Sequence, residues 1–299
     1  MGRFYKLILL TLLVLAVLKL FLPEMKNNKE LISAFWSNKT HSSSEFNVIA
    51  CGDSRVYRGI SGDVVAPLNK QFKFINLGYS SAGLSEDYFD FVVSKFDSNS
   101  KNNFLLVGIT PHSLTKEAFK NEELTSYQQT SKFAIFRHKK LSPILKYFAP
   151  YKPKELLNTS PPNYLQTFEN NGWVASDKIN PDSTLAIKSY QKTFSNYQAD
   201  NELAHSMIDK LTQIANTGII VIAFRPPTTS KMSQLEDYIS GINMERIKRQ
   251  LEKNGIKWLD FNNSDFVSYD GSHLNETSAR KLSLAIGHQI KETYFSQKQ

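Results

Sequence analysis

Two short segments, far apart in the sequence, carry residue types that suit nucleophilic catalysis. The first, Gly52-Asp53-Ser54, presents a serine, and the second, Asp270-Gly271-Ser272-His273, presents an acid and a histidine three residues apart. A serine hydroxyl is a weak nucleophile until a base takes its proton, and a histidine base needs a carboxylate to hold its tautomer. The pattern therefore predicts Ser54 as the nucleophile, His273 as the base and Asp270 as the acid that orients it.

Apolar runs that end in turn residues predict the elements that position these segments. Five runs are rich in β-branched and aromatic residues, as buried strands are: 46–50, 72–77, 104–109, 218–224 and 256–261. Apolar residues at helical spacing predict helices over 84–96, 203–215, 235–253 and 278–294. This alternation predicts an α/β fold in which helices cover both faces of a parallel sheet.

In a sheet of this kind the functional site lies at the carboxyl ends of the strands. Gly52-Asp53-Ser54 follows the first predicted strand, so Ser54 lies on the turn into the next helix, and Gly78 ends the second strand, where its backbone N–H can face an oxyanion. Residues 115–195 form a long insertion between the third and fourth strands. An insertion of this length is typically functional or a small subdomain, and we interpret it as a cap over the strand ends.

At these residues the chain resembles the SGNH, or GDSL-type, hydrolase family. Gly52-Asp53-Ser54 resembles the first sequence block of the family, Asn76-Leu77-Gly78 the second, and Asp270-x-x-His273 the fifth. The resemblance covers about residues 46–110 and 219–290. It implies a flavodoxin-like, three-layer α/β/α sandwich with a five-stranded parallel sheet, the triad named above, and the backbone N–H groups of Ser54 and Gly78 as oxyanion donors. Members of the family hydrolyse or transfer acyl groups, often on carbohydrates.

The third block departs from the family pattern. The family has Gly-x-Asn-Asp, whereas this chain has Gly108-Ile109-Thr110-Pro111-His112. Thr110 takes the position of the asparagine, and we expect it to donate one hydrogen bond to the oxyanion. Loss of an oxyanion donor lowers the rate about 10²–10³-fold. By architecture alone, the chain is similar to proteins of envelope polysaccharide O-acetylation and teichoic acid alanylation, which work beside a membrane-bound acyl-transfer partner.

Four further residues are candidates for substrate binding. Arg55 and Arg58 flank the nucleophile, Arg225 ends the fourth strand, and His112 follows the third. Guanidinium groups suit an anionic substrate such as a phosphate or a uronate. The alternative for Arg225 is a salt bridge and for His112 a structural role, and we favour both alternatives. For the arginines beside the nucleophile, the alternative is surface ion pairs with Asp53, Asp63 or Glu86.

The catalytic residues also have structural alternatives. Ser54 suits the N-cap of the helix that follows it. Asp270 and His273 suit a turn and a cap before the last helix. Gly78 suits a position that requires a positive φ. Cys51, the only cysteine, is interpreted as a small core residue.

The N-terminus carries a membrane signal. Residues 4–22 form an apolar run that ends before Pro23. Arg3 stands directly before the run and Lys6 lies near its start. At 1.5 Å per residue the run is about 28 Å long, enough to cross a bilayer core. We predict a transmembrane signal anchor over 1–30, a linker over 31–45, and a domain over 46–299 that lies outside the cytoplasm at the cell membrane.

The charge distribution argues against nucleic-acid binding. The net charge is +8, and its excess lies in residues 1–30 and 131–154 rather than over the whole domain. The segment 132–154 mixes seven cations with aromatic residues and suits an anionic polymer or lipid headgroups; the alternative is a solvated face. A single cysteine excludes an internal disulfide and a cysteine-built zinc site, and we expect neither metal nor cofactor.

These features together predict a function in the cell envelope. We expect a serine-dependent acyl ester hydrolase or O-acyltransferase that acts on envelope or extracellular carbohydrate outside the membrane. Its partners would be the acylated polysaccharide and a membrane-bound acyl-transfer protein. The alternative is a degenerate scaffold of the same family, which binds polysaccharide or a membrane partner without chemistry.

Overall fold

The computed structural model describes residues 2–20, 29–145 and 163–296. Five strands form one sheet: β1 (Val48–Cys51), β2 (Phe74–Asn76), β3 (Phe104–Gly108), β6 (Ile220–Phe224) and β7 (Lys257–Leu259). Every neighbouring pair is parallel, and the spatial order is β2-β1-β3-β6-β7. The expected α/β fold with a five-stranded parallel sheet is confirmed, and the order is that of a doubly wound sheet.

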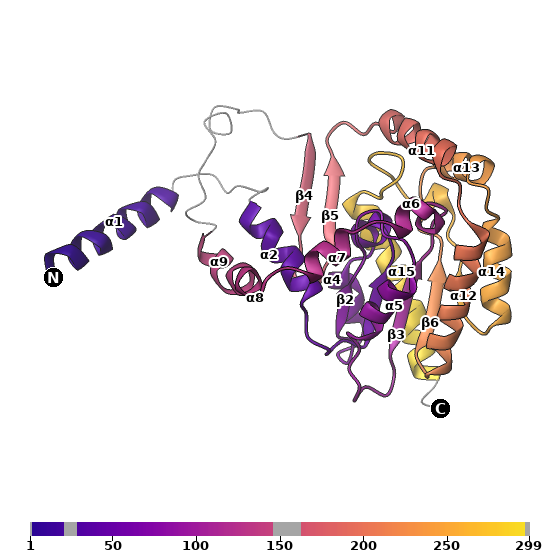
Figure 1. Ribbon diagram of the computed structural model, residues 1–299, viewed down its shortest axis with the longest axis horizontal. Helices are drawn as coiled ribbons and strands as arrows, with labels where there is room; N and C mark the ends of the chain where they lie inside the picture. Colours follow the sequence, from indigo (N-terminus) through magenta and orange to yellow (C-terminus); the bar gives the residue numbers. More distant parts are fainter. Residues whose placement is uncertain (1, 21–28, 146–162, 297–299) are drawn as a thin grey trace.

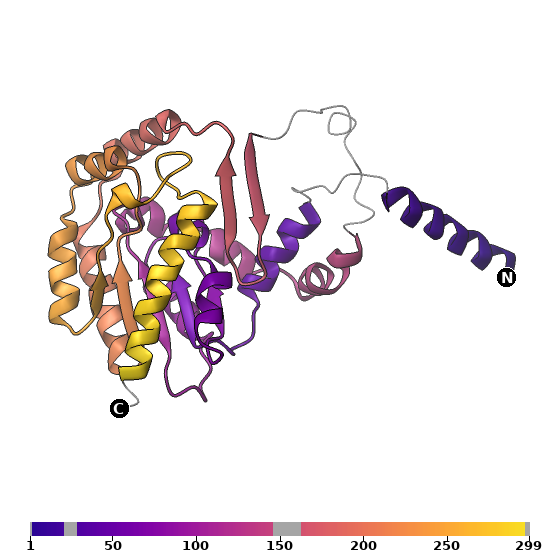
Figure 2. The same ribbon diagram turned by 180° about the vertical axis from the view of Figure 1, so that it is seen from behind.

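Helices cover both faces of this sheet because both faces are apolar. Ile49 and Cys51 of β1 belong to one core, together with residues of α5 (Glu86–Val93), α12 (Asn201–Asn216) and α14 (Met244–Lys253). Val48 and Ala50 point to the other core, which α3 (Ser54–Gly59) and α15 (Glu276–Ser296) close. Figures 1 and 2 show α5 and α15 on opposite faces. Alternate side chains of β1 therefore contribute to the two cores on opposite faces of the sheet.

Shorter helices connect these elements. The segment expected to be one helix over 235–253 forms two, α13 (Ser230–Ile239) and α14. Gly241 lies between them with a φ of +78°, a left-handed conformation that ends the helix. The remaining connecting helices are α4 (Gly62–Val65), η1 (Ala66–Leu68), η2 (His112–Leu114) and η4 (Asn263–Asp265).

The described part of the insertion 115–195 contains α6 (Lys116–Phe119), α7 (Glu123–Gln128), α8 (Lys132–Phe136), η3 (Arg137–Leu141), α9 (Ser142–Leu145), an antiparallel hairpin of β4 (Tyr164–Phe168) and β5 (Val174–Lys178), and α11 (Thr184–Asn196). It is spread over the domain: α11 packs on α13, whereas η3 and α9 pack on helix α2 (Lys29–Thr40). The hairpin turn meets β2, because the Asn76 N–H donates to the Asn171 carbonyl at 2.8 Å. Figure 1 shows α11 beside α13 at the end of the sheet to which β6 points. Residues 146–162 lie outside the described residues.

The N-terminal helix α1 spans Gly2–Leu20. Within the described ranges, no helix is long and apolar enough to cross a membrane, so the expected transmembrane helix is not found there. Residues 1 and 21–28 of the expected anchor 1–30 lie outside the described residues.

A second helix, α2 (Lys29–Thr40), occupies most of the stretch expected to be a linker, and it packs on the domain. Trp36 is buried and stacks on Tyr127, with 5.2 Å between ring centroids. Lys39 is also buried and donates to the Gly172 carbonyl at 3.1 Å.

Two cations of the basic segment 132–154 contact α2 and the residue that follows it. Arg137 pairs with Glu30, and Lys139 donates to the His41 carbonyl at 2.9 Å.

Candidate active site

The two segments that the sequence singled out meet at the carboxyl edge of the sheet. Ser54 is the first residue of α3, which Gly52 and Asp53 separate from the end of β1, and it is half-buried. Its Oγ lies 2.8 Å from His273 Nε2, and His273 Nδ1 lies 2.8 Å from Asp270 Oδ2. A proton on Nδ1 donates to the carboxylate and leaves Nε2 as the acceptor for the serine hydroxyl. The structure therefore brings the three predicted catalytic residues together as a Ser-His-Asp triad.

Asp270 also shapes the loop that carries the histidine. Its Oδ1 accepts from the N–H groups of Ser272 at 2.9 Å and His273 at 2.8 Å. Gly271 has a φ of +92°, which lets the loop turn tightly enough for both bonds. Burial raises the pKa of the Asp270 carboxyl, but hydrogen bonds and the attraction of His273 outweigh it and hold this pKa well below its usual range. Asp270 is therefore an anion that fixes both the loop and the imidazole.

The imidazole of His273 is set up as a base. Burial lowers its pKa, and the nearby charge of Arg58 lowers it further, while the hydrogen bond and charge of Asp270 raise it. The net shift is downward, so the ring is neutral at neutral pH and able to accept a proton. The ring of Tyr269 stacks on it at a centroid distance of 5.9 Å and fixes its orientation.

Gly78 lies beside α3, but its N–H is occupied. It donates to Asn76 Oδ1 at 2.9 Å. A Cβ at Gly78 would lie 2.8 Å from the backbone nitrogen of Tyr57, so this glycine is required by the close approach of α3. Its φ is not positive, so the conformational alternative does not apply. In this arrangement the expected oxyanion donor is used within the protein.

Thr110 does not face the oxyanion position as expected. Its buried hydroxyl donates to Asp53 Oδ2 at 2.7 Å and accepts from the Ser113 N–H at 3.1 Å. A hydroxyl has one proton, so Thr110 has none left for a substrate. Asp53 Oδ1 accepts from the Arg55 N–H, which caps α3. The backbone N–H of Ser54 has no acceptor among the described residues, so it is the expected oxyanion donor that stays free.

Two of the arginines proposed for substrate binding form a structural network instead. Arg55 is buried, and its guanidinium makes a two-pronged contact with Glu236 of α13 at 2.5 and 3.2 Å. Arg225 binds the same carboxylate at 3.0 Å and Asp237 at 2.7 Å. Arg55 also donates to Ser272 Oγ at 3.1 Å. These two arginines therefore connect α3, the end of β6, α13 and the loop of the catalytic histidine.

The partner of Arg55 could not be read from the sequence. The acids considered there were near in sequence, whereas Glu236 is 181 residues away and fully buried. For Arg225 the structure has the salt bridge that we favoured.

Arg58 differs from both. Its Nε donates to the Tyr57 hydroxyl at 3.0 Å and its Nη1 to the Tyr269 hydroxyl at 2.6 Å. Within the described ranges no carboxylate lies at ion-pair distance from it. Arg58 is thus a cation at the triad that neutral partners hold in place.

His112 lies near the site without a direct contact to the triad. Its ring meets the Tyr190 ring of α11 edge-to-face at a centroid distance of 6.0 Å. Burial lowers its pKa, Asp53 opposes that shift, and Arg55 adds to it. Tyr190 in turn accepts from Ser272 Oγ at 3.1 Å. The insertion therefore reaches the loop of the catalytic histidine, although Tyr190 was not among the residues that the sequence singled out.

In the part of the chain that the structure describes, no three His, Cys, Asp or Glu side chains are grouped to hold a metal ion.

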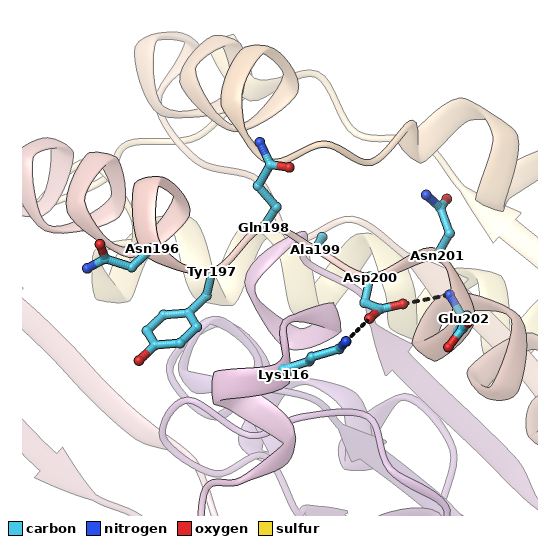
Figure 3. Close-up of a pocket in the computed structure, with 8 residues that line it drawn as sticks. All are labelled: Lys116, Asn196, Tyr197, Gln198, Ala199, Asp200, Asn201 and Glu202. Atoms are coloured by element: carbon cyan, nitrogen blue, oxygen red, sulfur yellow. Dashed lines mark hydrogen bonds and ion pairs between the residues drawn. The ribbon is translucent and has the colours of Figure 1, made fainter.

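An open surface hollow lies at the start of α12, lined by Lys116 and residues 196–202 (Figure 3). In it Lys116 pairs with Asp200 at 3.1 Å, and Asp200 accepts from the Glu202 N–H at 2.8 Å. None of its lining residues belongs to the triad.

Comparisons with protein-family models, curated proteins and solved structures found no match to this chain.

Proposed function

We propose that this protein is an SGNH-type, serine-dependent acyl ester hydrolase or O-acyltransferase that acts on carbohydrate. The observation that carries the proposal is the continuous hydrogen-bonded chain Ser54–His273–Asp270 at the carboxyl edge of a parallel sheet. A neutral imidazole, oriented by an anionic carboxylate and placed on a serine hydroxyl, is the arrangement that activates serine for acyl transfer.

The reaction follows from these contacts. Ser54 Oγ attacks the ester carbonyl while His273 Nε2 takes its proton, and the carbonyl oxygen becomes an oxyanion near the Ser54 N–H. His273 then gives the proton to the leaving alkoxide, the ester C–O bond breaks, and an acyl-serine remains. Water or a sugar hydroxyl next loses its proton to His273 and attacks the acyl-serine. That proton returns to Ser54 as the acylated product leaves.

The N-terminal pattern supports a location outside the membrane as part of this proposal. An apolar run behind two basic residues favours export, and an envelope polysaccharide is then the accessible substrate. A membrane-bound acyl-transfer protein would be the donor of the acyl group. We also propose that the insertion acts as a cap, because Tyr164 and Tyr190 lie against residues of the catalytic loop. A cap that excludes water favours transfer to a sugar over hydrolysis.

The test uses O-acetylated methyl glycosides with the full-length protein and its Ser54→Ala variant. Proton NMR follows free acetate and acetyl groups that move to a second, unacetylated glycoside. The proposal expects one or both products with the native protein and neither with Ser54→Ala. Turnover that persists in Ser54→Ala contradicts a serine mechanism.

A second candidate is a binding scaffold of the same fold without chemistry. It is favoured by one observation: the Gly78 N–H and the Thr110 hydroxyl are both used inside the protein. This candidate expects no turnover with the native protein, together with polysaccharide binding that is equal in the native protein and in Ser54→Ala. Binding measured by calorimetry on both proteins separates it from the enzyme.

A further inference from the structure

The position of Arg58 defines a second feature of the site. Ser54 and Arg58 are four residues apart on α3, so they lie on one face of the helix about one turn apart. Arg58 Nη1 donates to the Tyr269 hydroxyl, and the Tyr269 ring stacks on His273. The Arg58 charge also acts on His273 directly, since it lowers the pKa of that imidazole. Three observations thus place this guanidinium beside the nucleophile and its base.

The hydrogen bonds of Arg58 within the described residues leave three of its guanidinium N–H donors unused. A guanidinium has five N–H donors, and Tyr57 and Tyr269 use one on Nε and one on Nη1. The remaining donors are one on Nη1 and both on Nη2. These form the planar fork that binds two oxygens of one carboxylate or phosphate.

No acid in the described part of the chain neutralises this charge. Glu236, which pairs with Arg55 and Arg225, makes no contact with Arg58. Burial raises the pKa of Glu123 of α7 and the charge of Arg58 opposes that shift, but the two side chains are beyond ion-pair distance. Lys178 of β5 lies over the Tyr269 ring at 5.9 Å and adds a second positive charge to the region. A largely buried cation without a counter-ion is costly, and an anionic ligand removes that cost.

We propose that Arg58 is the anion-binding subsite of the acyl-transfer centre, so that the acylated sugar, or its neighbour in the polymer, carries a carboxylate or a phosphate. This inference rests on the proposed function and names its substrate class. The single helical turn between Ser54 and Arg58 places the anionic group on the same sugar ring as the ester or on the next ring.

The experiment compares three O-acetylated substrates: a methyl glucoside, a methyl glucuronide and a methyl glucoside 6-phosphate. For each protein the measured quantity is the ratio of kcat/KM for an anionic substrate to kcat/KM for the neutral one. A bidentate bond to a charged group is worth about a 10- to 100-fold preference. We expect a ratio of about 10 to 100 with the native protein and a ratio near one with Arg58→Gln. The glucuronide and phosphate arms show which anion is preferred.

Two more variants sharpen the result. Arg58→Lys keeps the charge and loses the planar fork, so its ratio should fall between the native value and that of Arg58→Gln. Arg246→Gln removes an exposed arginine on α14 and should keep the native ratio. A native ratio near one, or a ratio that is unchanged in Arg58→Gln, overturns the anion-binding inference. The proposed function is tested separately, because it requires only that turnover of the neutral ester depends on Ser54.

A binding measurement decides the inference even if no ester is turned over. Methyl glucuronide and glucose 6-phosphate are titrated into Ser54→Ala and into Ser54→Ala with Arg58→Gln. The inference expects tighter binding of one or both anions than of methyl glucoside to the first protein, and loss of that difference in the second. Equal binding of all three sugars to the first protein contradicts it.

Discussion

Removing the charge of Glu236 should cost several kcal/mol of stability, because it is a buried ion-pair partner of two arginines. It is fully buried, and its two oxygens accept from the buried Arg55 and from Arg225. Glu236→Gln keeps the size of the side chain and removes the charge, so Arg55 is left as a buried cation without a counter-ion. Breaking a buried ion pair in this way costs about 3–5 kcal/mol. That is a large part of the 5–15 kcal/mol or so that stabilises a typical native protein.

Asp237 provides the matched control. It is the next residue of α13 and pairs with Arg225, but its side chain is 53% exposed. An exposed pair is worth about 0–1 kcal/mol, so Asp237→Asn should change little. Urea unfolding of both full-length variants, followed by circular dichroism, measures the two free energies of unfolding. If Glu236→Gln costs no more than Asp237→Asn, the role given to this network is refuted.

Three further predictions concern the triad and its surroundings. Asp270→Asn should lower kcat about 10⁴-fold, because His273 loses the carboxylate that holds its tautomer; steady-state kinetics on an O-acetylated sugar measures the loss, and a change of less than tenfold contradicts the assigned role. In the native protein kcat/KM should fall as the pH drops through the pKa of His273, below the ordinary histidine value of about 6.5. Arg58→Gln removes a charge that lowers this pKa, so its acidic limb should move to higher pH, and a limb that stays in place refutes the electrostatic link. Thr110→Val should cost about 1–3 kcal/mol of stability, because Asp53 loses a buried donor. If instead thermal unfolding is unchanged and only the rate falls, Thr110 is an oxyanion donor after all.

The sheet was predictable because its strands have a strong local signal. Runs such as 104–109 and 218–224 are apolar without interruption, which indicates burial on both faces, and β3 and β6 occupy them. The position of Ser54 followed, since it lies on the short turn between β1 and α3. The break between α13 and α14 was missed, although Gly241 marked it, because apolar spacing continues on both sides.

Pairings between distant residues were beyond the sequence. The motif showed that Thr110 stands where the family has an asparagine. It did not show where the Thr110 hydroxyl points, which is set by its hydrogen bond to Asp53. Glu236 carried no local sign that it binds Arg55, since only the fold brings α13 to α3. The buried face of α2 was hidden in the same way, because the segment is short and the residues that pack against it, such as Tyr127, lie far away in the sequence.

The most direct test of the account is chemical labelling of Ser54. The full-length protein is treated with a serine-directed fluorophosphonate, and its intact mass is measured beside that of Ser54→Ala. The account predicts one adduct on the native protein, absent from the variant, because His273 activates only this serine. A native protein that is folded by circular dichroism and gains no adduct, or an adduct that persists in Ser54→Ala, contradicts it.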